Sequence, residues 1–491
     1  MHIKRFLLLF CICFFLHSCI SCSHLNSDQE PMTEVTLEDS FVKAMDSQEF
    51  EKGSWPDPEW WNLFDDTQLS SFVEIALTHS PTMQMAEAKV KEIYARARGT
   101  KSFLYPDLDV YFSDNWEHLS KGSLFRFPPS LIPSAINQLD LSLNFRYEFD
   151  IWGKNLNLYR AELGMARAEM AEAAQVRLVL SVQVCKEYYN VQINEKKQML
   201  YNELLSLRSK RFELIQERFT YGLDSRLQIL VMERAVQEVQ QELQEIQNEI
   251  AQNRHSLNVL MGNSPDTHPL LMLLKKISFD KPFPLPENLS LDLLSRRADI
   301  SAAIWRLEAQ AKKVGAAKAA FYPNINLMAL AGFESLSWAD FLSPANFQGF
   351  LNPALNLPIF KGGRLRAHLK EALATFDAAV GAYNATVLQA AKEAADSISS
   401  LILIDRQALI HFESLLSALN TVSIHIMRFQ QGVDNRLVAI QAQEMALQEE
   451  ISQLDLERLK IFTVLKLIQA LGGGFYAPTT IPINPQDSHG K

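Results

Sequence analysis

The chain has 491 residues, with 47 Lys and Arg against 57 Asp and Glu, which gives a formal charge of −10. Hydrophobic residues make up 47% of the sequence, so the chain is too apolar to be disordered, and its acidity argues against nucleic acid as a partner. Beyond the N-terminus no run of about 18 apolar residues occurs, so no membrane-spanning helix is predicted. These numbers alone describe an acidic globular chain of about three domains.

The N-terminal segment contradicts a cytoplasmic location. Residues 1–18 combine a basic start with a short apolar stretch, as is typical of a secretory signal peptide. Cys19 follows the small residue Ser18, which resembles a bacterial lipoprotein processing site where the cysteine becomes lipidated, for example with palmitate. We therefore predict a lipid anchor at Cys19 and a lipidated segment over 19–67; Cys22 is the alternative, and an ordinary signal peptide is the other interpretation.

Two pairs of similar segments reveal an internal repeat. FLYPDLDV at 103–110 matches AFYPNINL at 320–327, and RFTYGLDSRL at 218–227 matches RFQQGVDNRL at 428–437. The offset is near 210 residues, far longer than the period of a solenoid.

The repeat divides the mature chain into two halves, 68–282 and 283–474, separated by a proline-rich linker and followed by a flexible tail at 475–491. Each half is predicted to contain a helix, two strands, a very long helix, a break and a second helix. The expected fold is therefore mainly α-helical, with a small β-region built from both halves.

The predicted helices come first and last in each half. The initial helix of the first half is expected to run from about Leu69 to Tyr105, where Pro106 would end it. The stretch from Asn155 to Thr220 contains no proline, and as one helix it would be about 100 Å long. Such a length indicates coiled-coil packing rather than a globular helix.

Alternation of apolar and polar residues predicts strands at about 107–114, 138–149, 324–334 and 347–360. Period two places the apolar side chains on one face, which fits either a half-buried soluble sheet or a membrane β-barrel. The signal peptide favours the barrel. Four strands cannot close a barrel, and open edges are not tolerated in lipid, so several chains would have to share it.

The segments that follow each long helix carry a heptad-like seam with one polar interruption each, Asn253 and Arg458. The seam residues are Val236, Val239, Leu243, Ile246, Ile250, Leu257 and Leu260 in the first half, and Leu447, Ile451, Leu454, Ile461, Leu465 and Ile468 in the second. At the turns before these helices, Gly222 and Gly432 suit a positive φ. Asp224 and Asp434 are expected to cap the next helix.

Sequence motifs of enzymes are missing: there is no P-loop, HExxH, GxSxG or coherent metal-ligand spacing, so no catalytic residue, metal or cofactor is predicted. Asp65 and Asp66 precede a helix start and are explained by capping. Cys185 lies in a predicted helix and is expected to be a small core residue.

Six motifs in this order resemble the TolC-like outer-membrane efflux proteins, in particular their lipoprotein branch of the OprM and NodT types. They are WWNLFDDTQL (60–69), LLSRRADI (293–300), VGAAKAAFYPNINL (314–327), LPIFKGGRLRA (357–367), RFQQGVDNRLVAIQAQ (428–443) and ALGGGF (470–475). The resemblance implies a homotrimer in the outer membrane, with four strands per chain in a twelve-stranded barrel and a helical tunnel in the periplasm. It further implies a periplasmic adaptor and an inner-membrane pump of the RND or ABC type as partners, with export of drugs or other small solutes.

The resemblance also implies where the periplasmic gate and adaptor contact lie, namely at the hairpin ends. The residues are Tyr221, Gly222, Leu223, Gln431, Gly432, Val433, Leu437 and Gln441. Gln441 stands where the family often has an acid, which weakens the case for a cation-binding gate ring. A type I protein-secretion duct and a purely structural coiled-coil lipoprotein are the alternative functions.

Overall fold

The computed structural model describes residues 52–53, 55–118, 120, 135–267, 271–274, 277, 285–286 and 296–476. The predictions at Cys19, Cys22 and the signal peptide lie outside these residues. The elements in chain order are β1 (Lys52–Gly53), η2 (Trp60–Phe64), α3 (Thr67–His79), α4 (Pro81–Ser102), β2 (Asp107–His118), β3 (Ala135–Phe149), α5 (Lys154–Thr220), α6 (Arg226–Leu260), β4 (Leu285–Pro286), α8 (Ala298–Ala319), β5 (Asn324–Ser335), η3 (Pro344–Asn346), β6 (Phe347–Asn356), α9 (Arg364–Gln430) and α10 (Arg436–Ala470).

The internal repeat appears as two helical hairpins of equal dimensions. Helices α5 and α9 have 67 residues each, and α6 and α10 have 35 each. At 1.5 Å per residue the long helices extend about 100 Å, as the sequence predicts for 155–220. None of the helices in the described part of the chain combines the length and the apolar composition of a membrane span.

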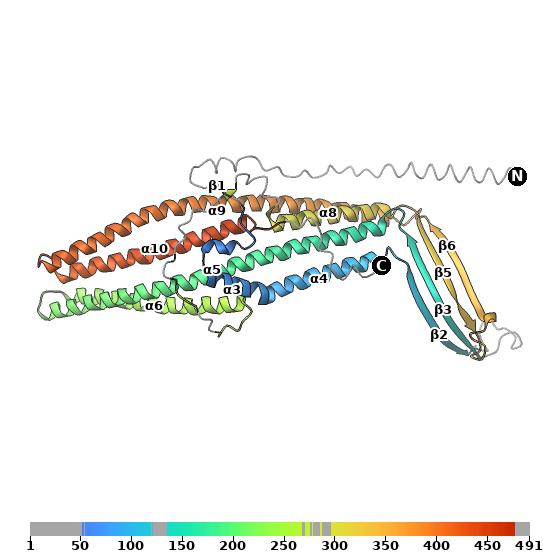
Figure 1. Cartoon of the computed structure of the whole chain (residues 1–491), viewed down its shortest axis with the longest axis horizontal. Helices are drawn as coiled ribbons and strands as arrows, with labels where there is room; N and C mark the ends of the chain where they lie inside the picture. Colours follow the sequence, from blue (N-terminus) through green and yellow to red (C-terminus); the bar gives the residue numbers. More distant parts are fainter. Residues whose placement is uncertain are drawn as a thin grey trace. The chain divides into compact units, whose positions relative to one another are not determined.

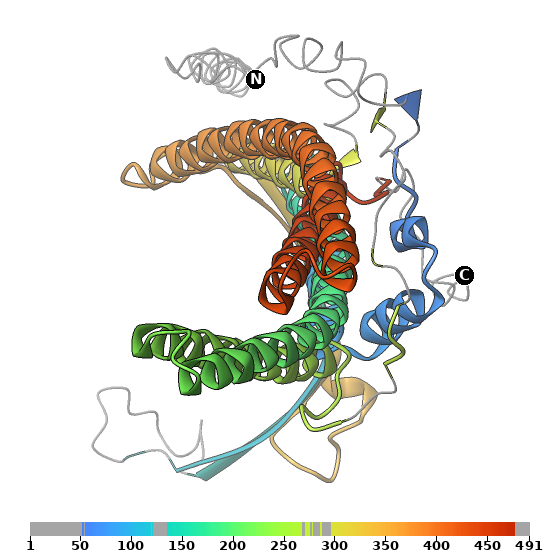
Figure 2. The ribbon, with the colours of Figure 1, turned by 90° about the vertical axis from the view of Figure 1, so that its left-hand side faces the viewer.

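The hairpins run side by side, with their turns at the end away from the sheet (Figure 1). Viewed along the helices, the two hairpins follow an arc, and α3 and α4 lie on its outer side (Figure 2). Helix α5 is the central element, because α3, α4, α6, α8 and α10 all pack against it.

Strands β2, β3, β5 and β6 form one antiparallel sheet in that order. Residues opposite one another share a face, so Phe112, Leu141, Phe333 and Phe347 form one apolar row across all four strands. The other face is mostly polar on β2 and β3, where Arg146 Nη2 lies 2.6 Å from a carboxylate oxygen of Asp109, and mixed on β5 and β6, which place Met328, Leu330 and Phe350 on it. Within the described residues, β2 and β6 have no strand beyond them and are the edges of the sheet.

The structure corrects the limits of some predicted elements. The helix expected from Leu69 to Tyr105 is two helices, because Ser80 is extended (φ −61°, ψ 129°) ahead of Pro81, where proline disfavours the helical conformation. Strand β6 ends at Asn356, four residues before the predicted limit, and β2 continues to His118 rather than 114. Helix α4 ends at Ser102, before Pro106 is reached.

The hydrophobic core lies at the level where α3, α5, α8, α9 and α10 meet. Trp60, Leu69 and Tyr188 are almost completely buried in it, and so is Cys185, as predicted. Asp66 caps α3 by accepting from the backbone N–H groups of Gln68 and Leu69, and Tyr188 donates to its other oxygen over 2.6 Å. A second cluster closer to the turns joins both predicted seams through Leu204, Val239, Leu243, Leu447 and Ile451.

Two glycines of one repeat allow a matched test of backbone constraint. Gly222 and Gly262 both have positive φ, but an added Cβ meets open space at Gly222 and lies 2.6 Å from the carbonyl oxygen of His79 at Gly262. Gly222→Ala is expected to lower the free energy of unfolding by about 1 kcal/mol, because alanine disfavours a positive φ. Gly262→Ala should lower it by about 2–5 kcal/mol, because the backbone near His79 must also move. Thermal unfolding in detergent should therefore show the larger fall in Tm for Gly262→Ala, and equal falls would contradict this account.

Candidate gate at the hairpin ends

The two hairpin turns have the same backbone. Gly222 and Gly432 both adopt a φ of 73°, which confirms the need for glycine at this point. The residues on either side of them are exposed: Tyr221 and Leu223 in the first turn, Gln431 and Val433 in the second. The predicted contact residues therefore form two exposed tips rather than a closed pocket within one chain.

The aspartates of the turns do not cap the following helices, and that prediction is wrong. Ser225 caps α6 and Asn435 caps α10, each through its own side-chain oxygen. Asp224 instead reaches back to the preceding helix, where Arg218 Nε donates to it over 2.7 Å. The side chain one position later is the one that faces the free backbone N–H groups.

The second turn has a more extensive ion-pair network than the first. Both Nε and Nη2 of Arg428 donate to Asp434, over 2.9 and 3.0 Å, and Nδ1 of His425 lies 2.8 Å from the same carboxylate. The side-chain hydrogen bonds from Arg428 and then His425 lower the pKa of Asp434 to about 2. At the position of the repeat that corresponds to His425, the first hairpin has the buried Ile215.

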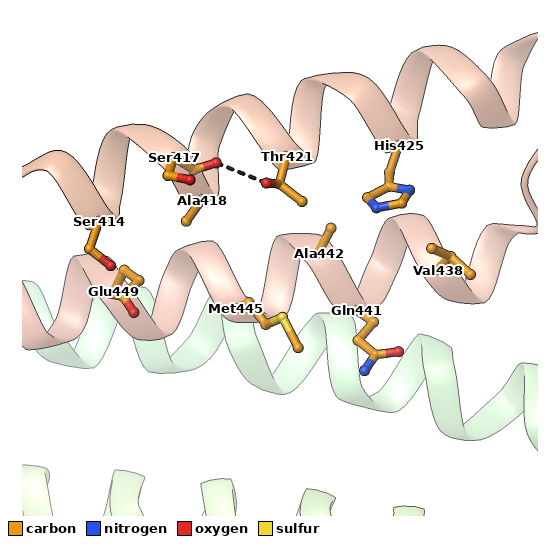
Figure 3. Close-up of a pocket in the computed structure, with 10 residues that line it drawn as sticks. All are labelled: Ser414, Ser417, Ala418, Thr421, His425, Val438, Gln441, Ala442, Met445 and Glu449. Atoms are coloured by element: carbon orange, nitrogen blue, oxygen red, sulfur yellow. Dashed lines mark hydrogen bonds between the residues drawn. The ribbon is translucent and has the colours of Figure 1, made fainter.

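A groove of about 540 Å³ lies between α9 and α10 close to the second turn. Figure 3 shows His425 and Thr421 on α9 with Ala442 of α10 opposite them, whereas Gln441 and Met445 are drawn on the side of α10 away from α9. Gln441 is exposed and is one of the residues that line the groove, whereas Leu437, one turn earlier, is half-buried and is not part of its lining. The structure thus places these two predicted gate residues on one helix but in different surroundings.

Ion pairs between α5 and α10 connect the hairpins to each other. Arg211 on α5 donates to Glu444 on α10 over 2.8 Å, and the side chains are 21% and 10% exposed. Closer to the core, Lys197 on α5 lies 3.0 Å from Asp455 on α10. The second carboxylate oxygen of Glu444 is buried and has no hydrogen-bond partner in the described part of the chain.

The sequence analysis predicted neither the ion pairs at the turns nor those between the hairpins. The pairs at the turns had a signal in the sequence, because both repeated strings begin with Arg and contain Asp six residues later. The pairs between α5 and α10 had no such signal, because their partners are separated by more than 200 residues.

The hairpins and the sheet agree with what comparisons with known proteins find. A family model described as outer membrane efflux protein matches residues 72–263 and 289–473. The chain belongs to the outer membrane efflux protein family.

Relatives in this family include drug-resistance proteins. The fusaric acid resistance protein FusA of Burkholderia cepacia is 31% identical over 317 residues, which cover 64% of this chain and 59% of that protein. The multidrug resistance outer membrane protein MdtP of Escherichia coli K12 is 26% identical over 93% of this chain and 94% of its own length. Among solved structures, the outer membrane protein VceC of Vibrio cholerae is 31% identical with a TM-score of 0.74, over 86% of this chain and all of that one.

Membership of this family makes the chain an outer-membrane efflux protein, as the sequence predicts. The fold class is confirmed, since the solved relatives share the long helical hairpins and the small sheet. Among the described residues, no group of three His, Cys, Asp or Glu side chains is arranged to hold a metal ion.

The Asp434 network predicts a pH response of the second turn. Because the folded-state pKa of about 2 lies below the usual 3.8, its stabilising effect is complete above about pH 4 and is lost as the pH falls through 2. Hydrogen exchange of the amides at 431–436, corrected for intrinsic rates, should therefore be faster at pH 2 than at pH 5.

In Asp434→Asn those amides should already exchange faster at pH 5, because Arg428 and His425 lose their charged partner. The matched variant Asp224→Asn should affect only the first turn, where a single arginine pairs with the aspartate. Unchanged exchange in Asp434→Asn would show that the network does not hold the turn.

Proposed function

We propose that the chain is the outer-membrane exit channel of a tripartite efflux system and works as a homotrimer. The open sheet carries this proposal. Strands β2 and β6, with 12 and 10 residues, are edges in a single chain, and each unpaired backbone group in lipid costs several kcal/mol. Pairing β2 of one copy with β6 of the next removes every edge, and three copies give a closed barrel of about twelve strands.

The two faces of the sheet support a water-filled interior. The apolar row through Phe112 and Leu141 suits lipid, and the opposite face carries Asp109, Arg146 and Asp140. Gln348 Nε2 donates to Asp140 over 3.2 Å across the sheet, so the polar groups on this face are joined to one another. Such a face lets polar solutes pass by diffusion.

The hairpin ends are the proposed contact with a periplasmic adaptor. Exposed apolar residues gather there, including Leu223 and Val433, which are 64% and 60% exposed. The groove between α9 and α10, lined by hydroxyl groups, small residues and Met445, lies within reach of a partner helix. The adaptor would connect the channel to an inner-membrane pump of the RND or ABC type, which supplies the energy.

The gate is proposed at the same end. Leu437 and Gln441 follow the second turn on α10, so in a trimer three copies of each would surround the axis and narrow the tunnel. Binding of the adaptor would separate the hairpins, and the solute would then leave passively. Drugs and other small solutes are the proposed cargo, in keeping with the names of the relatives FusA and MdtP.

The function is tested with the full chain purified in mild detergent. A trimer by light scattering, with discrete conductance steps in planar lipid bilayers, is the expected result. A monomer without conductance would overturn the channel and the shared barrel together.

Smaller side chains at the proposed gate should increase the ion conductance of the channel in the absence of its partners. Leu437→Ser combined with Gln441→Ser is expected to raise the conductance of the isolated trimer several-fold, because smaller side chains leave a wider opening. The matched control uses the corresponding positions of the first hairpin, Leu227→Ser with Val231→Ser, which should leave the conductance nearly unchanged. Equal effects of both pairs would remove the gate from Leu437 and Gln441.

The lipid anchor is proposed at Cys19 and is tested by labelling. Cells grown with radioactive palmitate should label the wild-type protein and Cys22→Ala, but not Cys19→Ala. Anchoring by several acyl chains is firm, so the Cys19→Ala protein should also be easier to extract from membranes. Labelling that disappears only in Cys22→Ala would move the anchor to that residue.

A further inference from the structure

The loop between β5 and β6, residues 336–346, folds back over the apolar face of the sheet. The ring of Phe112 on β2 lies 6.2 Å from Trp338 and 6.3 Å from Phe341 of this loop, measured between ring centroids. Because β3 separates β5 from β2, the loop must cross β3 to reach Phe112. It crosses on the apolar side, where Leu139 is completely buried.

Several polar groups of the loop bond to one another or to Ser335 at the end of β5. Asn346 Nδ2 donates to the carbonyl oxygen of Asp340 over 2.7 Å, and the hydroxyl of Ser335 donates to the Asp340 carboxylate over 3.2 Å. The backbone N–H groups of Ser337 and Ala339 donate to the hydroxyl oxygens of Ser335 and Ser337. Internal bonding of this kind lowers the cost of contact with lipid.

Large apolar side chains of the loop nevertheless remain exposed. Leu336, Trp338 and Leu342 are 60%, 58% and 63% exposed, and Phe347 at the start of β6 is 60% exposed. Only Phe341 is buried, against Trp338 and Phe112. Trp338, through its contact with Phe112, and Phe347, in the apolar row, lie on the apolar side of the sheet.

The loop lies near one end of the apolar face, and aromatic residues lie at the other end. Trp152 stacks on Tyr322 at the other end of β5, where its indole N–H donates to the carbonyl oxygen of Pro323. From Ile325 to Phe333, which lies level with Phe112, eight residue steps span about 26 Å along the strand, or about 20 Å along the normal at a tilt of about 40°. The apolar band of a membrane barrel is about 25 Å tall and has aromatic residues at both ends, so this stretch covers most of it.

We propose that residues 336–346 are a lipid-contacting loop that lies on the outside of the barrel, at the boundary between acyl chains and headgroups of the outer leaflet. This inference rests on the proposed outer-membrane channel. The occupant of the exposed patch is membrane lipid, because the patch is continuous with the apolar face of the sheet. In this position the loop does not cover the exit of the pore.

The test uses the fluorescence of Trp338 in liposomes that contain brominated phosphatidylcholine. Emission from Trp338 is the difference between the wild-type trimer and Trp338→Phe. We expect bromine near the headgroups to remove most of this emission and bromine near the chain ends to remove much less.

Trp305→Phe is the matched control, because Trp305 packs under Arg167 in the helical part of the chain. Its removal should raise the quenched fraction of the remaining emission, since an unquenched fluorophore is lost. Each sample is also checked for trimer formation and for conductance, so that a failed channel is recognised separately.

A conducting trimer whose Trp338 emission is not quenched at either depth would overturn the inference while leaving the channel intact. That result would place the loop in water or against a neighbouring copy. Stronger quenching by the deep bromine would also overturn it, because the loop would then lie in the acyl interior.

Discussion

The unpaired edges of the four-stranded sheet are the constraint on which the rest of the structure depends. A lipid environment supplies no water to hydrogen-bond the free N–H and C=O groups of β2 and β6. The difference between the two faces fixes the register of the strands, since a slip of one residue would move Phe112 or Leu141 to the polar side. Closure therefore has to come from further copies, and the long helices that continue from the strands must follow the same symmetry.

The duplicated plan meets this requirement with two hairpins of matching length. Each hairpin has one helix of 67 residues and one of 35, so both turns lie at the same end of the molecule. Each copy therefore contributes two similar walls to a tunnel. The two hairpins differ in chemistry, however. Where the first has Ile215, the second has His425 bound to Asp434, and it is the second that carries the groove beside Gln441.

Periodicity made most of the architecture predictable from the sequence. The alternation in 138–149, the seams ending at Leu260 and Ile468, and the proline-free stretch of α5 are local patterns, and each appears as expected. The turn glycines and Cys185 were also predictable, because backbone conformation and side-chain size decide them. The repeat itself could be read without any structure.

What the sequence did not reveal depends on contacts between distant segments or on the choice between neighbouring side chains. Asp224 and Ser225 can both cap a helix; in the structure Arg218 binds Asp224, and Ser225 accepts from the backbone N–H of Gln228. The break at Ser80 is different, because Pro81 is a local signal: proline disfavours the helical conformation of the residue before it and is accepted in the first turn of the next helix. The fold-back of residues 336–346 rests on Phe112, which lies more than 200 residues earlier in the chain.

The ion pairs between α5 and α10 limit where a gate can bend. Arg211–Glu444 and Lys197–Asp455 join helices from different halves, with the apolar cluster of Leu204, Val239 and Leu447 packed beside them. Separating the hairpins at this level would break both ion pairs and expose the apolar cluster beside them to water. Movement of the segment beyond Glu444, toward the turn, breaks neither pair. That segment contains Leu437 and Gln441, so a gate at these two residues can open by bending the ends of the hairpins while the tunnel above them keeps its packing.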